Sequence, residues 1–161
     1  MKRKDTWISG SGDVYTFDEI CNEIEAHVMN SGALFVGTDS FLSGETCVFA
    51  TAICLHGASN QLGGKYFFKR TRKSRKNFPK LLIRMLKETQ DSIDTAINLS
   101  ERFPDAELEV HLDIGTGKKS KTRKFTTMLT SYAKSAGFKC KIKPYAWASA
   151  AVADRHSKKY V

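Results

Sequence analysis

Three aspartates in this sequence stand where their carboxylates could share a metal ion. Asp39 follows the apolar run Ala-Leu-Phe-Val-Gly-Thr at 33–38, and Asp113 follows the alternating run Leu-Glu-Val-His-Leu at 108–112. Asp154 lies in the last stretch with a helical pattern. Hard divalent cations such as Mg²⁺ bind to oxygen ligands, and carboxylates from separate elements can surround them. The three residues therefore predict a metal site, if the fold brings these elements together.

Each aspartate also has an ordinary structural interpretation. Asp39 and Asp113 are of the residue type that forms turns or caps helices after a strand. Asp154 could pair with Lys158 one helical turn later. The surroundings of Asp154 favour the metal site, because small side chains let a helix lie close to a sheet. These small or apolar neighbours are Ala148, Ala150, Ala151, Val152 and Ala153.

The charge of the chain indicates a polyanionic partner. Its 161 residues include 26 Lys and Arg against 17 Asp and Glu, a formal net charge of +9. The basic residues cluster at 69–76 and 118–124, and each cation that neutralises a phosphate adds salt-sensitive affinity for nucleic acid. A solvated surface is the alternative. We predict binding to DNA, RNA or a hybrid, and no membrane partner, through Lys69, Arg70, Arg72, Lys73, Arg75, Lys118, Lys119, Lys121, Lys143 and Lys158.

Hydrophobic periodicity predicts the elements that would have to position the aspartates. The first helix begins with a capping box formed by Thr16 and Glu19. A long helix tolerates Pro79 in its first turn. The predicted strands cover 33–38, 47–56, 65–72, 107–112 and 139–144, and the predicted helices cover 16–29, 77–102, 120–136 and 147–159.

The order of these elements predicts how the first two aspartates meet. Short turns link the first three strands, which favours an antiparallel arrangement. The fourth strand follows a helix, so a right-handed crossover places it parallel to the first strand and beside it. Asp39 and Asp113 would then leave neighbouring strands at the same edge of the sheet.

Length and cysteine content indicate one cytoplasmic domain. A chain of 161 residues with 41% hydrophobic residues suits a single domain over 1–161, with an irregular segment at 1–15. The four cysteines lack Cys-x-x-Cys spacing, and reduced thiols suit a cytosolic protein. No apolar run reaches the ~20 residues of a membrane helix, and the N-terminus lacks the apolar region of a secretory signal.

Three motifs resemble those of the ribonuclease H-like superfamily, and more narrowly those of the YkuK-type branch of predicted nucleases. They are Val36-Gly-Thr-Asp-Ser40, Val110-His-Leu-Asp-Ile-Gly115 and the segment 142–158. The resemblance implies an α/β fold with a mixed five-stranded sheet, three antiparallel strands then two parallel ones, flanked by helices and with an extra N-terminal helix. It also implies a nuclease that hydrolyses phosphodiester bonds with two Mg²⁺ or Mn²⁺ ions. The implied metal ligands are Asp39, between the two ions, with Asp113 and Asp154.

The same resemblance implies a fourth catalytic acid on the long helix after the third strand. We assign it to Glu88, which follows Leu81 and Met85 at helical spacing and so lies close to the predicted buried stripe. Asp91 and Asp94 are later acids of the same helix. A solvated position for Glu88 is the alternative.

Histidines and aromatic residues near these motifs each have two interpretations. His111 shares a sheet face with Asp113, either as a structural histidine or as a residue that orients the metal ligands. His156 is either a mobile proton carrier or a packed residue. Tyr145 and Trp147 either stack on bases or belong to the core.

Two other functions stay open at this point. A chain that kept the basic surface but lost turnover would be a catalytically inactive ribonuclease H-like nucleic-acid-binding protein, and the uncertain fourth acid motivates that alternative. Phosphoryl chemistry on a nucleotide is the other. It is disfavoured because the segment 115–120 lacks the full Walker A pattern.

Overall fold

The computed structural model describes residues 5–59, 61, 63–115 and 117–158 of the chain. The strands over these residues are β1 (Thr6–Ser9), β2 (Val14–Thr16), β3 (Ala33–Ser43), β4 (Thr46–His56), β5 (Lys65–Ser74), β6 (Leu108–His111) and β7 (Lys139–Lys141). The α-helices are α1 (Phe17–Met29), α2 (Leu81–Arg102), α3 (Thr126–Ser135) and α4 (Asp154–Lys158). Short 3-10 helices η1 (Arg75–Asn77) and η2 (Arg123–Phe125) precede α2 and α3, and a π-helical segment, η3 (Ala148–Ala153), leads into α4.

The described strands form one mixed sheet of seven, in the order β2-β1-β5-β4-β3-β6-β7. Strands β3, β4 and β5 are antiparallel, and β6 and β7 run parallel to β3, as the sequence predicts. The predicted count of five is wrong, because two further strands form within and just after the segment 1–15 that was expected to be irregular. Strand β1 pairs with β5, and β2 pairs with β1. The predicted first helix forms as α1 with its capping box, but two strands precede it. Residues 1–4 lie outside the described residues.

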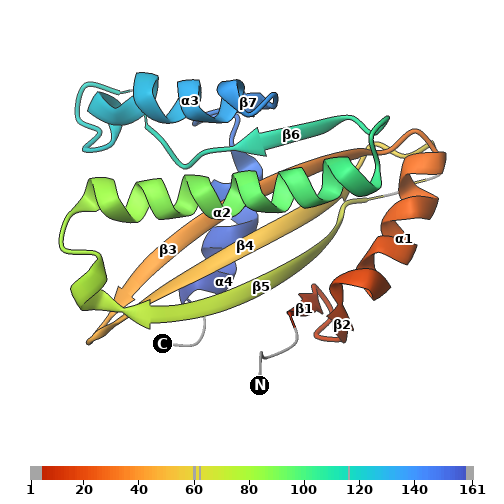
Figure 1. Ribbon diagram of the computed structural model, residues 1–161, viewed down its shortest axis with the longest axis horizontal. Helices are drawn as coiled ribbons and strands as arrows, with labels where there is room; N and C mark the ends of the chain where they lie inside the picture. Colours follow the sequence, from red (N-terminus) through yellow and green to blue (C-terminus); the bar gives the residue numbers. More distant parts are fainter. Residues whose placement is uncertain (1–4, 60, 62, 116, 159–161) are drawn as a thin grey trace.

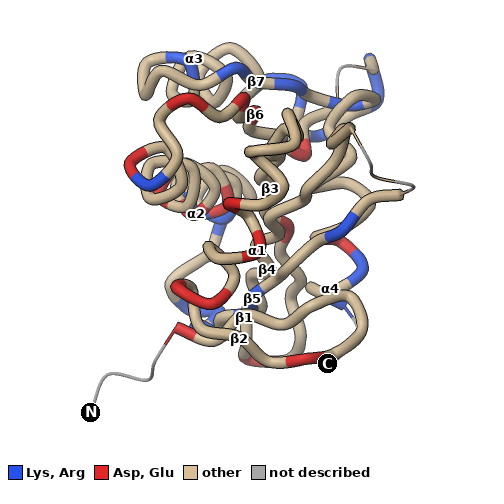
Figure 2. The backbone as a smooth tube through the Cα atoms, turned by 90° about the vertical axis from the view of Figure 1, so that its right-hand side faces the viewer, with Lys and Arg blue, Asp and Glu red and all other residues tan. Residues whose placement is uncertain are grey.

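Helices cover both faces of the sheet (Figure 1). Helices α1, α2 and α3 pack on one face, where Ile20, Leu99 and Leu129 join two apolar cores. Segment η3 and helix α4 pack on the opposite face, against a smaller cluster that includes Ala52 and Phe68. Figure 2 shows α2 and α3 on one side of the strands and α4 on the other.

Several elements begin or end at residues other than the predicted ones. Helix α2 begins at Leu81 instead of 77, because Pro79 disfavours helical backbone at the residue before it. The helix predicted from 120 begins as η2 at Arg123, and the final helix is π-helical over 148–153. The predicted end of that helix, Lys159, lies outside the described residues. No helix in the described part of the chain is long and apolar enough to cross a membrane.

Strand β3 extends well past its predicted end at residue 38. Strand β4 pairs with it along its whole length, with Asp39 opposite Ala50 and Ser43 opposite Thr46. Asp39 is therefore an internal residue of a strand, and the expectation that it stands at a strand end is wrong. Its backbone is held on the β4 side by a continuous antiparallel ladder, which makes its position rigid.

Candidate active site

Neighbouring parallel strands bring Asp39 and Asp113 to equivalent positions. The pairing of β3 with β6 ends at Gly37 opposite His111, and each aspartate lies two residues beyond its member of that pair. Side chains two residues apart on a strand share a face, so Asp39 lies on the face of Gly37. This is the face covered by η3 and α4.

Close contact between β3 and η3 determines how near the last helix comes to Asp39. A Cβ atom added to Gly37 would lie 2.4 Å from the backbone nitrogen of Ser149, so only glycine allows this approach. Helix α4 follows directly, and the Ser157 hydroxyl donates a hydrogen bond of 2.7 Å to Asp39 Oδ2. The small residues of η3 thus bring Asp154 and Ser157 to the sheet.

The Asp39 carboxyl is almost fully buried, with 6% of its surface exposed. Its pKa is raised to about 7, mainly by burial and also by the carboxylates of Asp113 and Asp154, against the lowering effect of the Ser157 hydroxyl. A carboxyl with this pKa exchanges its proton near neutral pH. The influence of Asp113 and Asp154 places three of the predicted acids within electrostatic reach of one another.

Glu88 reaches the same region from the opposite face of the sheet. It lies on α2, and the Ser40 hydroxyl donates a hydrogen bond of 2.6 Å to its Oε1. Burial raises the Glu88 pKa to about 8, with the negative charges of Asp39 and Asp113 adding to the effect. A small cavity of about 10 Å³ is lined in part by Glu88 and Asp113. Asp91 and Asp94 instead line a separate polar cavity beside β5.

Lysines neutralise the other two acids. Lys143 Nζ lies 2.7 Å from Asp113 Oδ1, and Lys158 Nζ pairs with Asp154 Oδ1 one helical turn away. Both lysine side chains are about half exposed, at 48% and 53%. The hydrogen bond that Lys158 donates to Asp154 raises the pKa of Lys158. These ammonium groups occupy positions where a bound cation would compete with them.

The chemistry of this donor set fits a hard divalent cation. Carboxyl groups from β3, α2, the segment after β6, and α4 lie at one end of the sheet. Burial, with a further contribution from neighbouring carboxylates, makes Asp39 and Glu88 hold their protons more tightly. Oxygen ligands of this kind suit Mg²⁺ or Mn²⁺. Among the residues that the structure describes, no three His, Cys, Asp or Glu side chains are close enough to hold one ion as they stand.

A comparison with protein families accounts for this arrangement. The family model described as Ribonuclease H-like matches residues 15–158. The chain belongs to the ribonuclease H-like family. Comparisons with curated proteins and with solved structures gave no match. The narrower assignment to the YkuK-type branch stays a prediction.

The two histidines near the acids of this ribonuclease H-like chain are packed and hydrogen-bonded. The His111 ring is fully buried, its Nδ1 accepts a hydrogen bond of 3.0 Å from Ala148 N–H, and its Nε2 donates to Glu109 at 2.8 Å. Burial lowers the pKa of His111, so the ring is neutral. Its hydrogen bond with Ala148 links β6 to η3. His156 stacks on Phe68 with ring centroids 3.6 Å apart. It is 5% exposed, which favours the packed residue over the mobile proton carrier among the two interpretations of His156.

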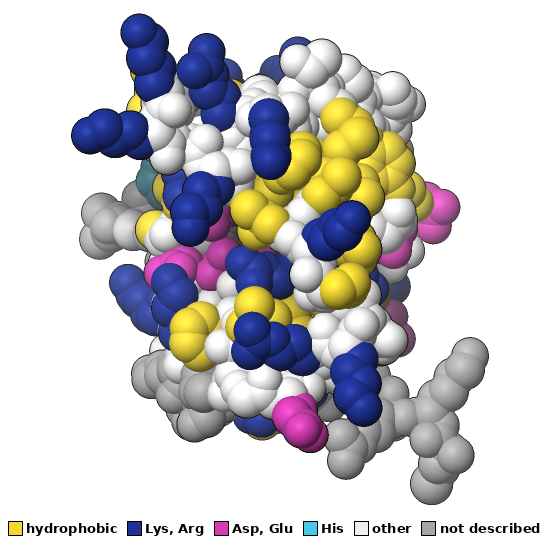
Figure 3. All heavy atoms as spheres, turned by 90° about the vertical axis from the view of Figure 1, so that its left-hand side faces the viewer, with side chains coloured by type: hydrophobic (Ala, Val, Ile, Leu, Met, Phe, Trp, Pro, Cys, Tyr) yellow, Lys and Arg dark blue, Asp and Glu magenta, His cyan; other side chains and the backbone are white. Residues whose placement is uncertain are grey.

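Basic side chains surround the acids at one end of the molecule. Figure 3 shows this end, where β3 and β5 finish and α2 begins, with acidic side chains in a hollow and lysine and arginine side chains above and below it. Residues 69–73 lie on β5, and Arg75 in η1 donates a hydrogen bond to Gly44 O. Lys118, Lys119 and Lys121 lie in the segment between β6 and η2.

The two aromatic candidates differ in exposure. Tyr145 is 70% exposed and free of the apolar cores. Trp147 packs on Phe35, with ring centroids 4.8 Å apart, and on His111. Trp147 is therefore mainly a packing residue, whereas Tyr145 is available to a partner.

Ser40 and Ser157 hold two of the acids and were not among the predicted site residues. Both have a signal in the sequence. Ser40 follows Asp39 on a strand, so it must face α2, which carries Glu88. Ser157 follows Asp154 by three residues on a helix and so shares its side.

Proposed function

We propose that this ribonuclease H-like chain is a metal-dependent nuclease that hydrolyses phosphodiester bonds of DNA or RNA with two Mg²⁺ or Mn²⁺ ions. The observation that carries the proposal is the position of four acids at one end of the sheet, where the parallel register of β3 and β6 brings Asp39 and Asp113 together. Burial and the neighbouring carboxylates raise the pKa of Asp39 to about 7 and that of Glu88 to about 8. Such concentrated, desolvated negative charge favours a divalent cation.

Each acid has a role in this proposal. Asp39 would lie between the ions, Asp113 and Asp154 would each complete one side, and Glu88 would assist. The chemistry that such ions supply is activation of a water and stabilisation of the leaving oxygen in an in-line displacement. Ser157 and Ser40 orient the Asp39 and Glu88 carboxyls.

The basic residues would hold the nucleic acid strand, and binding of this strand would release the acids from their lysine partners. Lys143 and Lys158, released from Asp113 and Asp154, can contact the phosphates on either side of the bond to be cut. The basic residues at 69–75 and 118–121 hold the backbone without selecting a base sequence. A substrate thus replaces the acids as the partner of both lysines.

Cleavage by purified protein tests the proposal. Labelled single-stranded, duplex, hybrid and branched oligonucleotides are incubated with Mg²⁺, with Mn²⁺ and with EDTA. Asp39→Asn is run beside Asp105→Asn, which changes an exposed aspartate in the turn before β6. We expect cutting that requires metal, is lost in Asp39→Asn and is kept in Asp105→Asn. Salt-sensitive binding without cutting on any substrate would overturn the nuclease.

The second candidate function is a catalytically inactive ribonuclease H-like nucleic-acid-binding protein. The lysine partners of Asp113 and Asp154 favour it, because ion pairs already neutralise the acids that a metal would need. Titration calorimetry with Mg²⁺ and Mn²⁺ separates the two functions. Metal binding lost in Asp39→Asn supports the nuclease, and an absence of binding in the unaltered protein supports the inactive alternative.

A further inference from the structure

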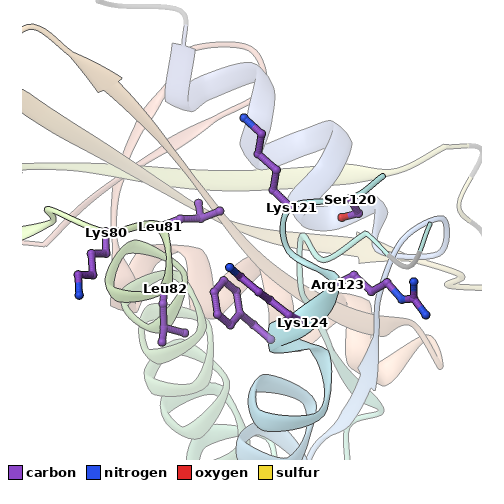
Figure 4. A pocket seen from close by; sticks show the side chains of 8 residues that line it. Lys80, Leu81, Leu82, Ser120, Lys121, Arg123 and Lys124 are labelled. Atoms are coloured by element: carbon purple, nitrogen blue, oxygen red, sulfur yellow. The ribbon is translucent and has the colours of Figure 1, made fainter. Parts of the chain in front are cut away.

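A groove of about 800 Å³ lies beside the acidic site, between the start of α2 and the segment that leads into α3. Figure 4 shows Lys80, Leu81 and Leu82 on the α2 side and Ser120, Lys121, Arg123 and Lys124 on the other. Lys124 extends between the two sides in this view. Phe125 also lines the groove.

The lining combines positive charge with apolar surface. Four of its eight residues are Lys or Arg, three are Leu or Phe, and none is acidic. Lys124 Nζ lies 5.1 Å from the centre of the Phe125 ring, so a cation and an aromatic face are presented together. Grooves that hold single-stranded nucleic acid combine cations for the backbone with aromatic faces on which bases stack.

The groove has a fixed position relative to the acids. Leu81 and Glu88 are seven residues apart on one side of α2, a distance of about 10 Å along the helix. The other wall belongs to the segment that begins after Asp113. Gly115 N–H donates a hydrogen bond of 2.8 Å to Thr122 Oγ1, and a Cβ atom on Gly115 would lie 2.4 Å from Ser120 Oγ. This folded segment keeps the groove within a few nucleotides of the acids.

We propose that the groove binds an unpaired stretch of nucleic acid beside the bond to be cut, which makes the substrate single-stranded DNA or RNA, or a strand with a single-stranded flank. A duplex presents its sugar–phosphate backbone outward and keeps its bases stacked inside, so the walls formed by Leu81, Leu82 and Phe125 would gain nothing from it. An unstacked base uses those walls while its phosphates meet Lys80 and Lys124. This inference rests on the proposed function for its link to cutting, but its binding step does not need turnover.

Binding in EDTA tests the groove separately from cutting. Fluorescence anisotropy at one fixed salt concentration compares a labelled single strand of DNA, the same strand in RNA, the duplex, and the DNA strand with abasic positions. We expect the single strands to bind about tenfold more tightly than the duplex, and the abasic strand to lose about tenfold. Equal affinity for the DNA and RNA strands would mean that the groove does not distinguish their sugars, and unequal affinity would show which sugar it prefers. Both outcomes support an unpaired ligand.

Two variants assign the effect to the groove. Phe125→Leu keeps an apolar side chain in the partly buried position but removes the aromatic face, and should lower affinity for the natural strand while leaving the abasic strand unchanged. Lys139→Ala removes an exposed lysine of β7, away from the groove, and should have little effect. Duplex binding as tight as single-strand binding, or equal affinity for abasic and natural strands, would overturn the proposal that the groove binds unpaired nucleic acid. A nuclease that cuts single strands despite unchanged binding in Phe125→Leu would keep the proposed function and lose this inference.

Discussion

The four acids of the site form two pairs that the protein neutralises in different ways. Serine hydroxyls donate hydrogen bonds to the buried Asp39 and to the half-buried Glu88, and the raised pKa values of these two acids favour protonation near neutral pH. Asp113 and Asp154 lie nearer the surface, and each is paired with a half-exposed lysine. One pair is therefore relieved of its charge by protons and the other by ammonium groups.

This difference indicates what each pair is built to do. Burying an ionised carboxylate without a counter-charge is costly, so Asp39 and Glu88 gain most from a cation placed between them and their neighbours. Exposed ion pairs contribute little to stability and exchange readily. In the proposed function, Asp39 and Glu88 would supply fixed ligands, and the lysine-paired acids would supply ligands that are released when a cation and a substrate arrive.

The largest expected effect comes from substituting Asp39, the acid proposed to contact both ions. Asp39→Asn should lower the rate of metal-dependent cutting by on the order of 10³-fold, because both proposed ion positions lose a ligand. Asp154→Asn should lower it by about 10²-fold, since one ion position is affected. Initial rates at saturating Mg²⁺ measure both.

Unfolding in EDTA serves as the control for these two variants. Asp39→Asn should unfold at a temperature no lower than that of the unaltered protein at pH 8, because it removes a buried negative charge. If Asp39→Asn and Asp154→Asn lost activity equally, the two pairs of acids would not differ in their contribution to cutting.

The stability of the metal-free protein should fall as the pH rises through the range in which the buried pair ionises. The ordinary pKa values are 3.8 for Asp39 and 4.5 for Glu88, against about 7 and about 8 in the fold. Below about pH 4 both carboxyls are protonated in the folded and unfolded chains. Between pH 5 and pH 7 the folded chain keeps protons that the unfolded chain has lost, so the slope is roughly 1.4 kcal/mol per pH unit for each such proton.

Denaturant unfolding at several pH values in EDTA measures this contribution. The contribution is fully present below about pH 4 and is gone above about pH 8. Glu88→Gln should flatten the curve, whereas Glu101→Gln, at an exposed position of the same helix, should not. Stability that rises from pH 5 to pH 8 in the unaltered protein would contradict the raised pKa values.

The sequence was sufficient for the frame of the site but not for the neutralisation of its acids. Strand order and the crossover rule predicted that the strand of Asp39 and the strand before Asp113 are parallel neighbours, because this depends on periodicity and chain connectivity. Glu88 was chosen from its spacing to the buried stripe of α2, and its role stays a prediction. The hydrogen bonds from Ser40 and Ser157 depend on how closely two helices approach the sheet, which local patterns do not determine.

Errors in the predicted elements have similar causes. The length of β3 depends on its pairing with β4 over eleven residues, so the apolar run at 33–38 marked only its first part. Strands β1 and β2 are short; β1 pairs with β5, a contact distant in sequence, and β2 pairs with β1. Segment η3 is π-helical and packs against Gly37, whereas its small residues alone predicted only a helix.

A smaller effect should follow from removing the hydroxyl that holds the buried pair. Ser157→Ala leaves the ionised Asp39 carboxylate without this donor, and should lower the free energy of unfolding by about 1–3 kcal/mol at pH 8. The loss should be smaller at pH 5, where Asp39 is protonated. Ser149→Ala is the matched control, since its buried hydroxyl donates to the backbone oxygen of Ala146 and its loss should not depend on pH.

The smallest effect on stability, but an informative one for binding, should come from the lysine-paired acids. Lys158→Met removes an exposed ion pair, so the free energy of unfolding should change by no more than about 0.5 kcal/mol. The same change frees Asp154 and removes a positive charge from the site, so Mg²⁺ affinity measured by calorimetry should rise about three- to tenfold. Lys65→Met, which removes a comparably exposed lysine paired with Glu23, should leave metal affinity unchanged. A lower affinity in Lys158→Met would mean that the lysine supports the metal site instead of competing for it, and the two pairs would then act as one.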